Sequence, residues 1–161
     1  MIVVSDTTPL ISLLKVGHLD LLDKYFGEVQ IPQAVFDELT SNKRFALEAE
    51  EIRNCPYIRV VQIEDDKSVD IIRRVTGLDL GESEAIILTD NLHADLLLMD
   101  EAKGRSVAEQ MGLKIMGTIG LLLASYRNGY ISADEIKECV DILENSEEHA
   151  FDCGFMDSQM P

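Results

Sequence analysis

The sequence predicts a three-layer α/β/α sandwich, in which helices cover both faces of a parallel sheet of about five strands. Short runs of β-branched and aliphatic residues alternate with helical patterns along most of the chain. Strands that alternate with helices favour parallel pairing through right-handed crossovers. The sequence has no internal repeat and no linker. We therefore expect one domain over residues 1–145, followed by an acidic, irregular tail over residues 146–161.

The composition is that of a globular protein with an unusual charge. Of the 161 residues 46% are hydrophobic, which is enough for a core without disulfides or a structural metal. No apolar run reaches the ~18 residues of a membrane span and no signal peptide is recognisable, so we expect a soluble, cytoplasmic protein. The net charge of −16 repels phosphate backbones. A nucleic-acid enzyme of this composition needs metal ions, a locally basic patch or a partner.

Cysteine and histidine residues give no sign of a zinc site or a disulfide framework. The cysteines are odd in number, widely spaced and without a CxxC motif, which favours free thiols with structural roles: Cys55, Cys139 and Cys153. The histidines lack partners that would make a catalytic base: His18, His93 and His149.

The amino-terminal elements place a first acid at a strand end. Residues 2–4 form a β-branched run, and apolar residues at helical spacing follow from residue 10 to residue 16. Thr8 and Pro9 are a good cap and first residue for that helix. Because Thr8 can supply the cap, we expect Asp6, at the end of the strand, to have another role.

The following elements supply a second acid and two further strands. Residues 29–31 indicate a strand, and Pro32 opens a helix in which Glu38 lies off the apolar face. The residue alone is equally consistent with a solvated helical glutamate. A polar helix over residues 42–53, a strand over 57–61 and a helix over 67–75 complete this half.

Residues 81–105 bring two more acids to one edge of the sheet. Glu82 opens a predicted helix, and Asp100 follows the apolar run of residues 94–99, which indicates a buried strand. Ligands bind at the carboxyl ends of strands in open parallel sheets, so Asp100 is better placed for chemistry than for stability. A helix to residue 111, a strand at 114–116, an apolar helix over 119–127 and a final helix from a capping box at Ser132 to about Leu143 follow.

Four acids from separate elements can therefore meet in one crevice: Asp6, Glu38, Glu82 and Asp100. Two carboxylates ~5 Å apart repel by ~3 kcal/mol at an effective dielectric of 20, so such a cluster needs a cation. Oxygen ligands without His or Cys select Mg²⁺ or Mn²⁺. A pair of such ions can promote phosphodiester hydrolysis.

Four segments in this order resemble the PIN domain family: residues 3–11, 31–39, 81–86 and 97–105. The last two are similar to the GEXEAI and LLXD(D/E)XXGR signatures of stand-alone prokaryotic PIN proteins, which are related to VapC-type toxins. The resemblance covers about residues 2–130. It implies an α/β sandwich and a metal-dependent ribonuclease that acts as the toxin of a toxin-antitoxin pair. It also places Asp6, Glu38, Glu82 and Asp100 on the acidic catalytic and metal-binding positions.

Several nearby residues are weaker candidates. Glu84 lies about 200° around the helix from Glu82, and the resemblance favours Glu82 as the site residue. Glu101 occupies a place where the family often has a second metal-binding acid. Hydroxyl and basic side chains that could contact substrate or water are Thr7, Lys103, Arg105 and Thr118.

The expected partners are an RNA substrate, a small antitoxin protein and a second copy of the chain. We expect no association with a membrane. The alternative function is a PIN-fold binding or regulatory protein with weak or absent nuclease activity, which the charge of −16 favours. A receiver domain would have adjacent acids after the first strand and a Lys after the last, but Asp6-Thr7 and Gly117-Thr118 stand there. A haloacid-type phosphatase would have a second Asp where Thr8 stands.

Overall fold

The structure is a computed structural model that describes the backbone of residues 1–152 and the side chains of residues 1–146. Its strands are β1 (Val3–Ser5), β2 (Val29–Pro32), β3 (Ile58–Val61), β4 (Leu96–Leu98) and β5 (Ile115–Met116). Its helices are α1 (Thr7–Val16), α2 (Leu21–Phe26), α3 (Gln33–Ser41), the 3₁₀ turn η1 (Lys43–Phe45), α4 (Ala46–Arg53), α5 (Asp66–Thr76), α6 (Leu80–Asn91), α7 (Ala102–Gln110), α8 (Thr118–Arg127) and α9 (Ala133–Asp152).

The five strands form one parallel sheet in the order β3-β2-β1-β4-β5. From β1 the chain moves outward through β2 to β3, and it then crosses back to place β4 on the other side of β1. Ligand sites in open parallel sheets lie where the strand order reverses in this way. Asp6 follows β1 and Asp100 follows β4, and the Asp6 amide donates to the Leu98 carbonyl at 2.9 Å. The reversal therefore brings the two acids to neighbouring strand ends.

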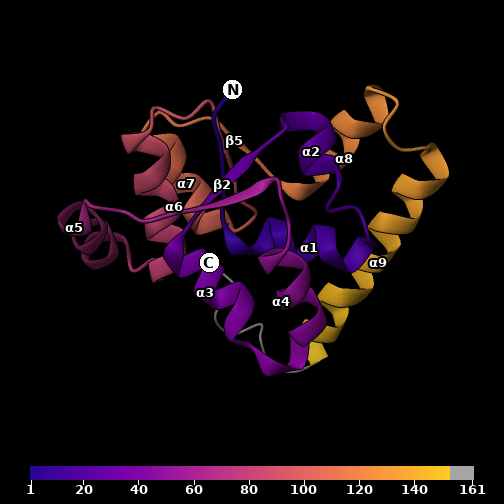
Figure 1. The fold of residues 1–161 in the computed structure, drawn as a ribbon, viewed down its shortest axis with the longest axis horizontal. Helices are drawn as coiled ribbons and strands as arrows, with labels where there is room; N and C mark the ends of the chain where they lie inside the picture. Colours follow the sequence, from indigo (N-terminus) through magenta and orange to yellow (C-terminus); the bar gives the residue numbers. More distant parts are fainter. Residues whose placement is uncertain (153–161) are drawn as a thin grey trace.

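Helices cover both faces of the sheet, as the sequence predicts (Figure 1). Val3 belongs to a buried cluster that includes residues of α1, α2, α8 and α9, whereas Val4 packs with residues of α5, α6 and α7. Successive strand residues point to opposite faces, which explains the division. In helix α6, eight of the nine residues from Gly81 to Thr89 are buried. The predicted α/β/α sandwich is thus confirmed.

Three predicted boundaries are wrong. Helix α1 begins at Thr7, with Asp6 in the N-cap position and Pro9 two residues inside the helix, so Thr8 is not the cap. The expected helix over residues 42–53 is divided at Phe45, whose backbone is not helical, into η1 and α4. Helix α9 continues to Asp152 and not to about Leu143, because the acidic segment keeps the helical backbone. Residues 153–161 of the predicted tail lie outside the described part.

Two other predictions concern caps and thiols. Ser132 and Glu135 form the predicted capping box, in which each side chain accepts from the other residue's amide. Cys55 and Cys139 are free thiols, and Cys153 lies outside the described residues. In residues 1–152 no helix is long and apolar enough to cross a membrane.

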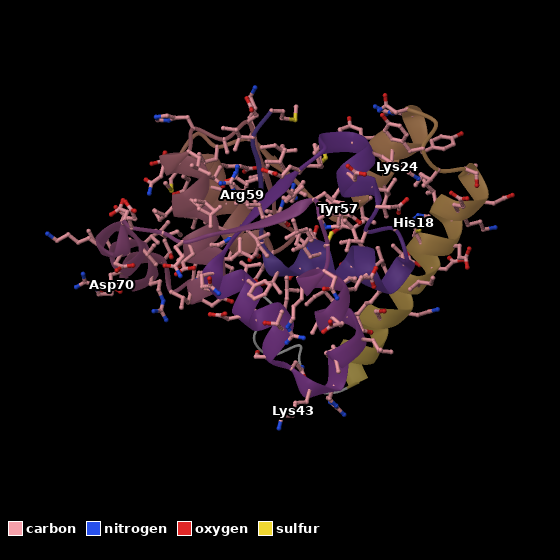
Figure 2. All side chains as sticks on the ribbon, in the orientation of Figure 1. His18, Lys24, Lys43, Tyr57, Arg59 and Asp70 are labelled. Carbon is pink, nitrogen blue, oxygen red and sulfur yellow. The ribbon has the colours of Figure 1, made fainter. Side chains whose placement is uncertain are left out.

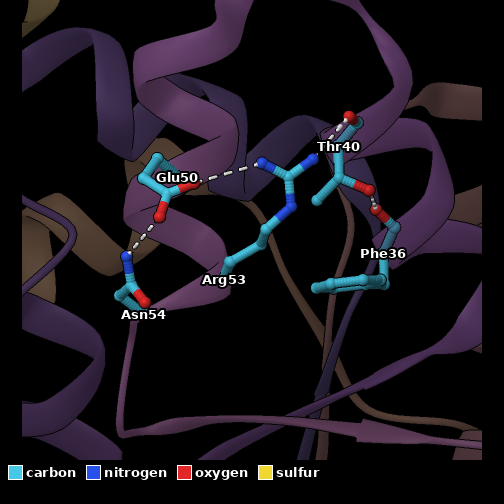
Figure 3. A network of polar contacts seen from close by, with 5 residues as sticks. All are labelled: Phe36, Thr40, Glu50, Arg53 and Asn54. Carbon is cyan, nitrogen blue, oxygen red and sulfur yellow. Dashed lines mark hydrogen bonds and ion pairs between the residues drawn. The ribbon is translucent and has the colours of Figure 1, made fainter.

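Helix α4 binds the carboxyl end of α3, the helix that carries Glu38. Arg53 donates to the Thr40 carbonyl at 3.1 Å and to Glu50 at 3.3 Å (Figure 3). The Asn54 amide donates to the other oxygen of Glu50 at 2.9 Å. These contacts satisfy a carbonyl at the end of α3 that has no partner inside the helix. They fix the direction in which α3 presents its acid.

Candidate active site

Asp6 is a buried acid without an ion-pair partner among the described residues. Its exposed fraction is 3%, and its side chain makes no capping hydrogen bond to α1. Burial, opposed by a contact with the Thr7 backbone, raises the pKa of Asp6 from 3.8 to about 7, and the charges of Asp79, Glu38 and Glu101 raise it further. A carboxyl group in this state favours a proton or a cation.

Glu38 is an exposed acid that two neighbours hold in place. The Thr7 hydroxyl donates to its Oε2 at 2.8 Å, which joins the start of α1 to α3. Gly81 lies against the same oxygen, since a Cβ added there would be 3.0 Å from it. A larger residue at position 81 would therefore shift the carboxylate by a few tenths of an ångström. Glycine leaves room for the close approach of α6 to Glu38.

The amino terminus of α6 carries two acids in a reciprocal capping box. Asp79 Oδ1 accepts from the Glu82 amide at 2.7 Å, and Glu82 Oε2 accepts from the Asp79 amide at 3.0 Å. Glu82 is buried, and burial together with a hydrogen bond to Glu101 raises its pKa from 4.5 to about 8. The backbone of Asp79 opposes the rise, and the charges of Asp79 and Glu101 add to it. The Glu82 and Glu101 side chains therefore face each other.

The Asp100 carboxylate binds the start of α8. Its Oδ1 accepts from the Thr118 amide at 2.7 Å, and its Oδ2 accepts from the Thr118 hydroxyl at 2.6 Å. An acid at the amino terminus of a helix is stabilised by the helix dipole and by free amides. Thr118 thus positions Asp100.

The remaining predicted residues lie around these acids. Glu84 is turned away from Glu82, and its Oε2 accepts from the Ala34 amide at 2.9 Å, in the first turn of α3. Arg105 donates to the Met99 carbonyl at 3.0 Å and so supports the backbone next to Asp100. Lys103 Nζ would lie 3.1 Å from a Cβ on Gly77, at the end of α5.

Two acids with raised pKa values and the three acids that contribute to these shifts form what we call the acidic cluster. Asp6 and Glu82 have the raised pKa values, and the contributing acids are Glu38, Asp79 and Glu101. The sequence prediction missed Asp79. The signal was available, since an Asp three residues before Glu82 is a capping-box pattern. Within residues 1–146 no three acids, histidines or cysteines converge tightly enough to form a preassembled metal-binding group.

The chemistry of the cluster nevertheless fits a hard divalent cation. Its ligands are carboxylate oxygens, with no His or Cys among the five members, which favours Mg²⁺ or Mn²⁺. Asp6 and Glu82 are buried and tend to hold protons near neutral pH, and a bound cation would replace those protons. Because the carboxylates are held apart by capping and hydroxyl contacts, ion binding requires side-chain rotation.

Comparison with known proteins identifies a family for nearly the whole chain. A family model described as a PIN domain matches residues 2–151. A search of curated proteins found no match.

Proposed function

Because this chain belongs to the PIN domain family, whose members are typically nucleases, we propose that it is a Mg²⁺- or Mn²⁺-dependent endoribonuclease that hydrolyses RNA phosphodiester bonds. The observation that carries the proposal is the burial of Asp6 and Glu82 next to three further acids at the carboxyl edge of the sheet. Such a cluster costs folding free energy when it is charged and uncompensated. A bound cation that takes part in the reaction would offset this cost.

Asp6, Glu82 and Glu101 would hold the metal, and Asp100 would contribute from the segment after β4. The bound ion would supply positive charge that activates water and stabilises the leaving oxygen. Because Asp6 and Glu82 offer only oxygen ligands, they favour hard cations over ions that prefer sulfur or nitrogen ligands. Thr118 keeps Asp100 in one orientation through two hydrogen bonds.

Glu38 is the best candidate to handle a proton of the attacking water. Glu38 is exposed, and the Thr7 hydroxyl engages only its Oε2. In hydrolysis the water oxygen forms a bond to phosphorus, the bond to the leaving oxygen breaks, and a carboxylate can accept the proton that water loses. Lys103 and Arg105 are the proposed phosphate contacts on the side of α7.

The biological role that we propose is that of a toxin in a toxin-antitoxin pair, related to VapC-type proteins, with a small antitoxin partner and a homodimeric state. The four segments quoted in the sequence support this. The proposed setting is the cytoplasm of a prokaryote.

A second candidate is a PIN-fold binding or regulatory protein with weak or absent nuclease activity. Two observations favour it: the net charge of −16, and the separation of the acids by capping contacts within the described side chains. Metal binding alone does not distinguish the two functions. Cleavage does.

The deciding experiment is cleavage of a mixed-sequence single-stranded RNA with Mg²⁺, Mn²⁺ or EDTA. The wild type is compared with Asp6→Asn and Asp100→Asn, and with Asp37→Asn, an exposed acid on α3 next to Glu38 and outside the acidic cluster, as matched control. Metal-dependent cleavage that both site variants lose and the control keeps supports the nuclease. No cleavage by a purified wild type free of bound inhibitor, with Mn²⁺ bound, would favour the binding protein.

A further inference from the structure

An apolar groove runs alongside the acidic cluster, between α1, α3 and η1. Its apolar walls are Ile11, Leu14, Leu39 and Phe45, and Glu38 forms part of its lining. The groove has a volume of about 200 Å³. Pockets that enclose whole drug-sized ligands measure ~300–1,000 Å³, so this groove accommodates one planar group and not a complete ligand. Because Glu38 belongs to both, a group seated in the groove lies next to the reacting centre.

Phe45 is an aromatic lining residue of the groove that is partly exposed to solvent. Its exposed fraction is 47%, and it connects η1 to α4 with a backbone that is not helical. Exposed aromatic side chains are platforms on which unpaired bases stack, because every base has a π-face. The neighbouring Asn42 uses its Oδ1 to accept from the Arg44 amide, so its NH₂ group is available for a base edge.

Basic side chains next to the groove could contact the phosphates of a nucleic-acid strand. Lys15 lines it, and Lys43 and Arg44 follow Asn42 in η1; Figure 2 shows Lys43 at the tip of the connection between α3 and α4. In the described side chains the ion pairs are Lys24–Asp20 and Arg53–Glu50, so these three cations have no acidic partner within 4.0 Å. Glu48 is the only acid besides Glu38 among the lining residues. Lys15 lines the groove, and Lys43 and Arg44 directly precede its lining residue Phe45 in a chain of net charge −16.

We propose that this groove is a base-binding subsite, in which Phe45 stacks on an unpaired RNA base next to the scissile phosphate while Lys15, Lys43 and Arg44 contact the flanking phosphates. The inference rests on the proposed ribonuclease function and adds the determinant of its nucleotide preference. Sequence-specific RNA recognition commonly splays out single-stranded bases onto aromatic side chains. Phe45 is accordingly the residue that selects the cleavage position.

The test measures cleavage and binding separately. Cut positions in a mixed-sequence single-stranded RNA are sequenced for the wild type, Phe45→Ala, Phe45→Leu and Phe45→Trp. Fluorescence anisotropy with the same labelled RNA, in EDTA, measures affinity for uncut strands. Leu47→Ala is the matched control, because Leu47 is 84% exposed two residues away and does not line the groove.

We expect Phe45→Ala to weaken RNA affinity about 5- to 150-fold, the equivalent of the ~1–3 kcal/mol of one stacked base, and to flatten the base preference at the cut. Phe45→Leu should behave like Phe45→Ala, since it restores apolar volume without a ring. Phe45→Trp should retain affinity, and Leu47→Ala should change neither readout.

The outcomes separate the inference from the proposed function. RNA binding that depends on Phe45 without any cleavage would support the subsite and contradict the nuclease. Cleavage and affinity that are equal in the wild type and Phe45→Ala would overturn the subsite alone. Unchanged affinity with an altered gel-filtration volume in Phe45→Ala would also overturn it and assign the groove to a protein contact. Absence of both cleavage and RNA binding would overturn both proposals.

Discussion

At the scale of single residues, hydrogen bonds decide which acids are free to act. Asp100 has both oxygens engaged by Thr118, and Glu38 has one oxygen engaged by Thr7. Asp6 has no side-chain cap contact, although it is the most buried of these acids. The free energy that compensates its burial must come from a proton or a cation.

Asp6 makes a specific prediction about pH. A group whose pKa is raised from 3.8 unfolded to about 7 folded binds more protons in the folded state over that interval. Stability therefore falls as pH rises from about 4 to 7, because the folded state must give up a proton that the unfolded state has already lost. Chemical denaturation of the metal-free protein at pH 5 and pH 8 should show lower stability at pH 8.

The control for that prediction is Asp6→Asn, which cannot ionise at this position. Its stability should depend less steeply on pH between 5 and 8 than that of the wild type, and it should be the more stable of the two at pH 8. Equal slopes would show that Asp6 does not titrate in this interval.

The Asp6→Asn variant should also lose at least about 100-fold in nuclease activity, since outer-shell changes alone cost 10- to 100-fold.

Thr118 is predicted to be the residue that positions Asp100. Thr118→Val removes the hydroxyl that donates to Oδ2 and should lower the free energy of unfolding by about 1.5–3 kcal/mol, the usual contribution of a hydrogen bond to a charged group. Thr118→Ser keeps the donor and should restore most of the loss. Thr40→Val removes a hydroxyl that bonds a helix carbonyl and should cost less than 1 kcal/mol in urea titrations. Comparable losses at positions 118 and 40 would contradict the positioning role.

At the scale of elements, three contacts hold α3 against its neighbours. Glu84 of α6 accepts from the Ala34 amide, Gly81 allows α6 to approach Glu38, and Arg53 binds the last turn of α3. These contacts use both ends of α3. The position of Glu38 is therefore set by α6 and α4 as much as by its own helix.

Gly81→Ala tests that arrangement. The new Cβ would lie 3.0 Å from Glu38 Oε2, which should shift the carboxylate and break its bond to Thr7. We expect kcat to fall about 10- to 100-fold, since small misplacements of catalytic groups are costly. Stability should change by less than about 1 kcal/mol, because Ala is a better helix former than Gly.

Gly120→Ala is the matched control, a helical glycine of α8 whose added Cβ would meet the Met116 side chain at 3.2 Å. It should leave kcat unchanged. A Gly81→Ala enzyme with wild-type kcat would show that the approach of α6 does not set the position of Glu38.

At the scale of the whole molecule, the net charge of −16 acts on folding and on metal binding alike. Self-repulsion destabilises the compact state, and salt screens it. We expect the melting temperature to rise with NaCl in the wild type and in Asp6→Asn to a similar extent. This is a general charge effect.

Mg²⁺ or Mn²⁺ at constant ionic strength should add a second, local stabilisation at pH 8. The expected rise in melting temperature is about 2–4 °C for each kcal/mol of binding free energy in a protein of this size. The rise should be smaller at pH 5.5, where protons compete for Asp6 and Glu82, and absent in Asp6→Asn. A metal response that Asp6→Asn retains would place the ion elsewhere on the acidic surface.

The sequence by itself determined the order of strands and helices. It also put Asp6, Glu82 and Asp100 at the ends of elements and Glu38 on the polar face of a helix. The alternation of strand and helix patterns and the helical spacing of apolar residues are local signals, so they can be recognised in the sequence. Helix ends were predicted less accurately, as the start of α1 and the length of α9 show.

The tertiary structure alone decided which acids meet. Placing β4 beside β1 brings the two strand ends together, and side-chain partners then turn Asp100 toward Thr118 while Asp79 and Glu101 join Glu82. The groove beside Glu38 likewise exists only because α1, α3 and η1 pack side by side. These features depend on contacts between residues distant in sequence, for which local periodicity carries no information.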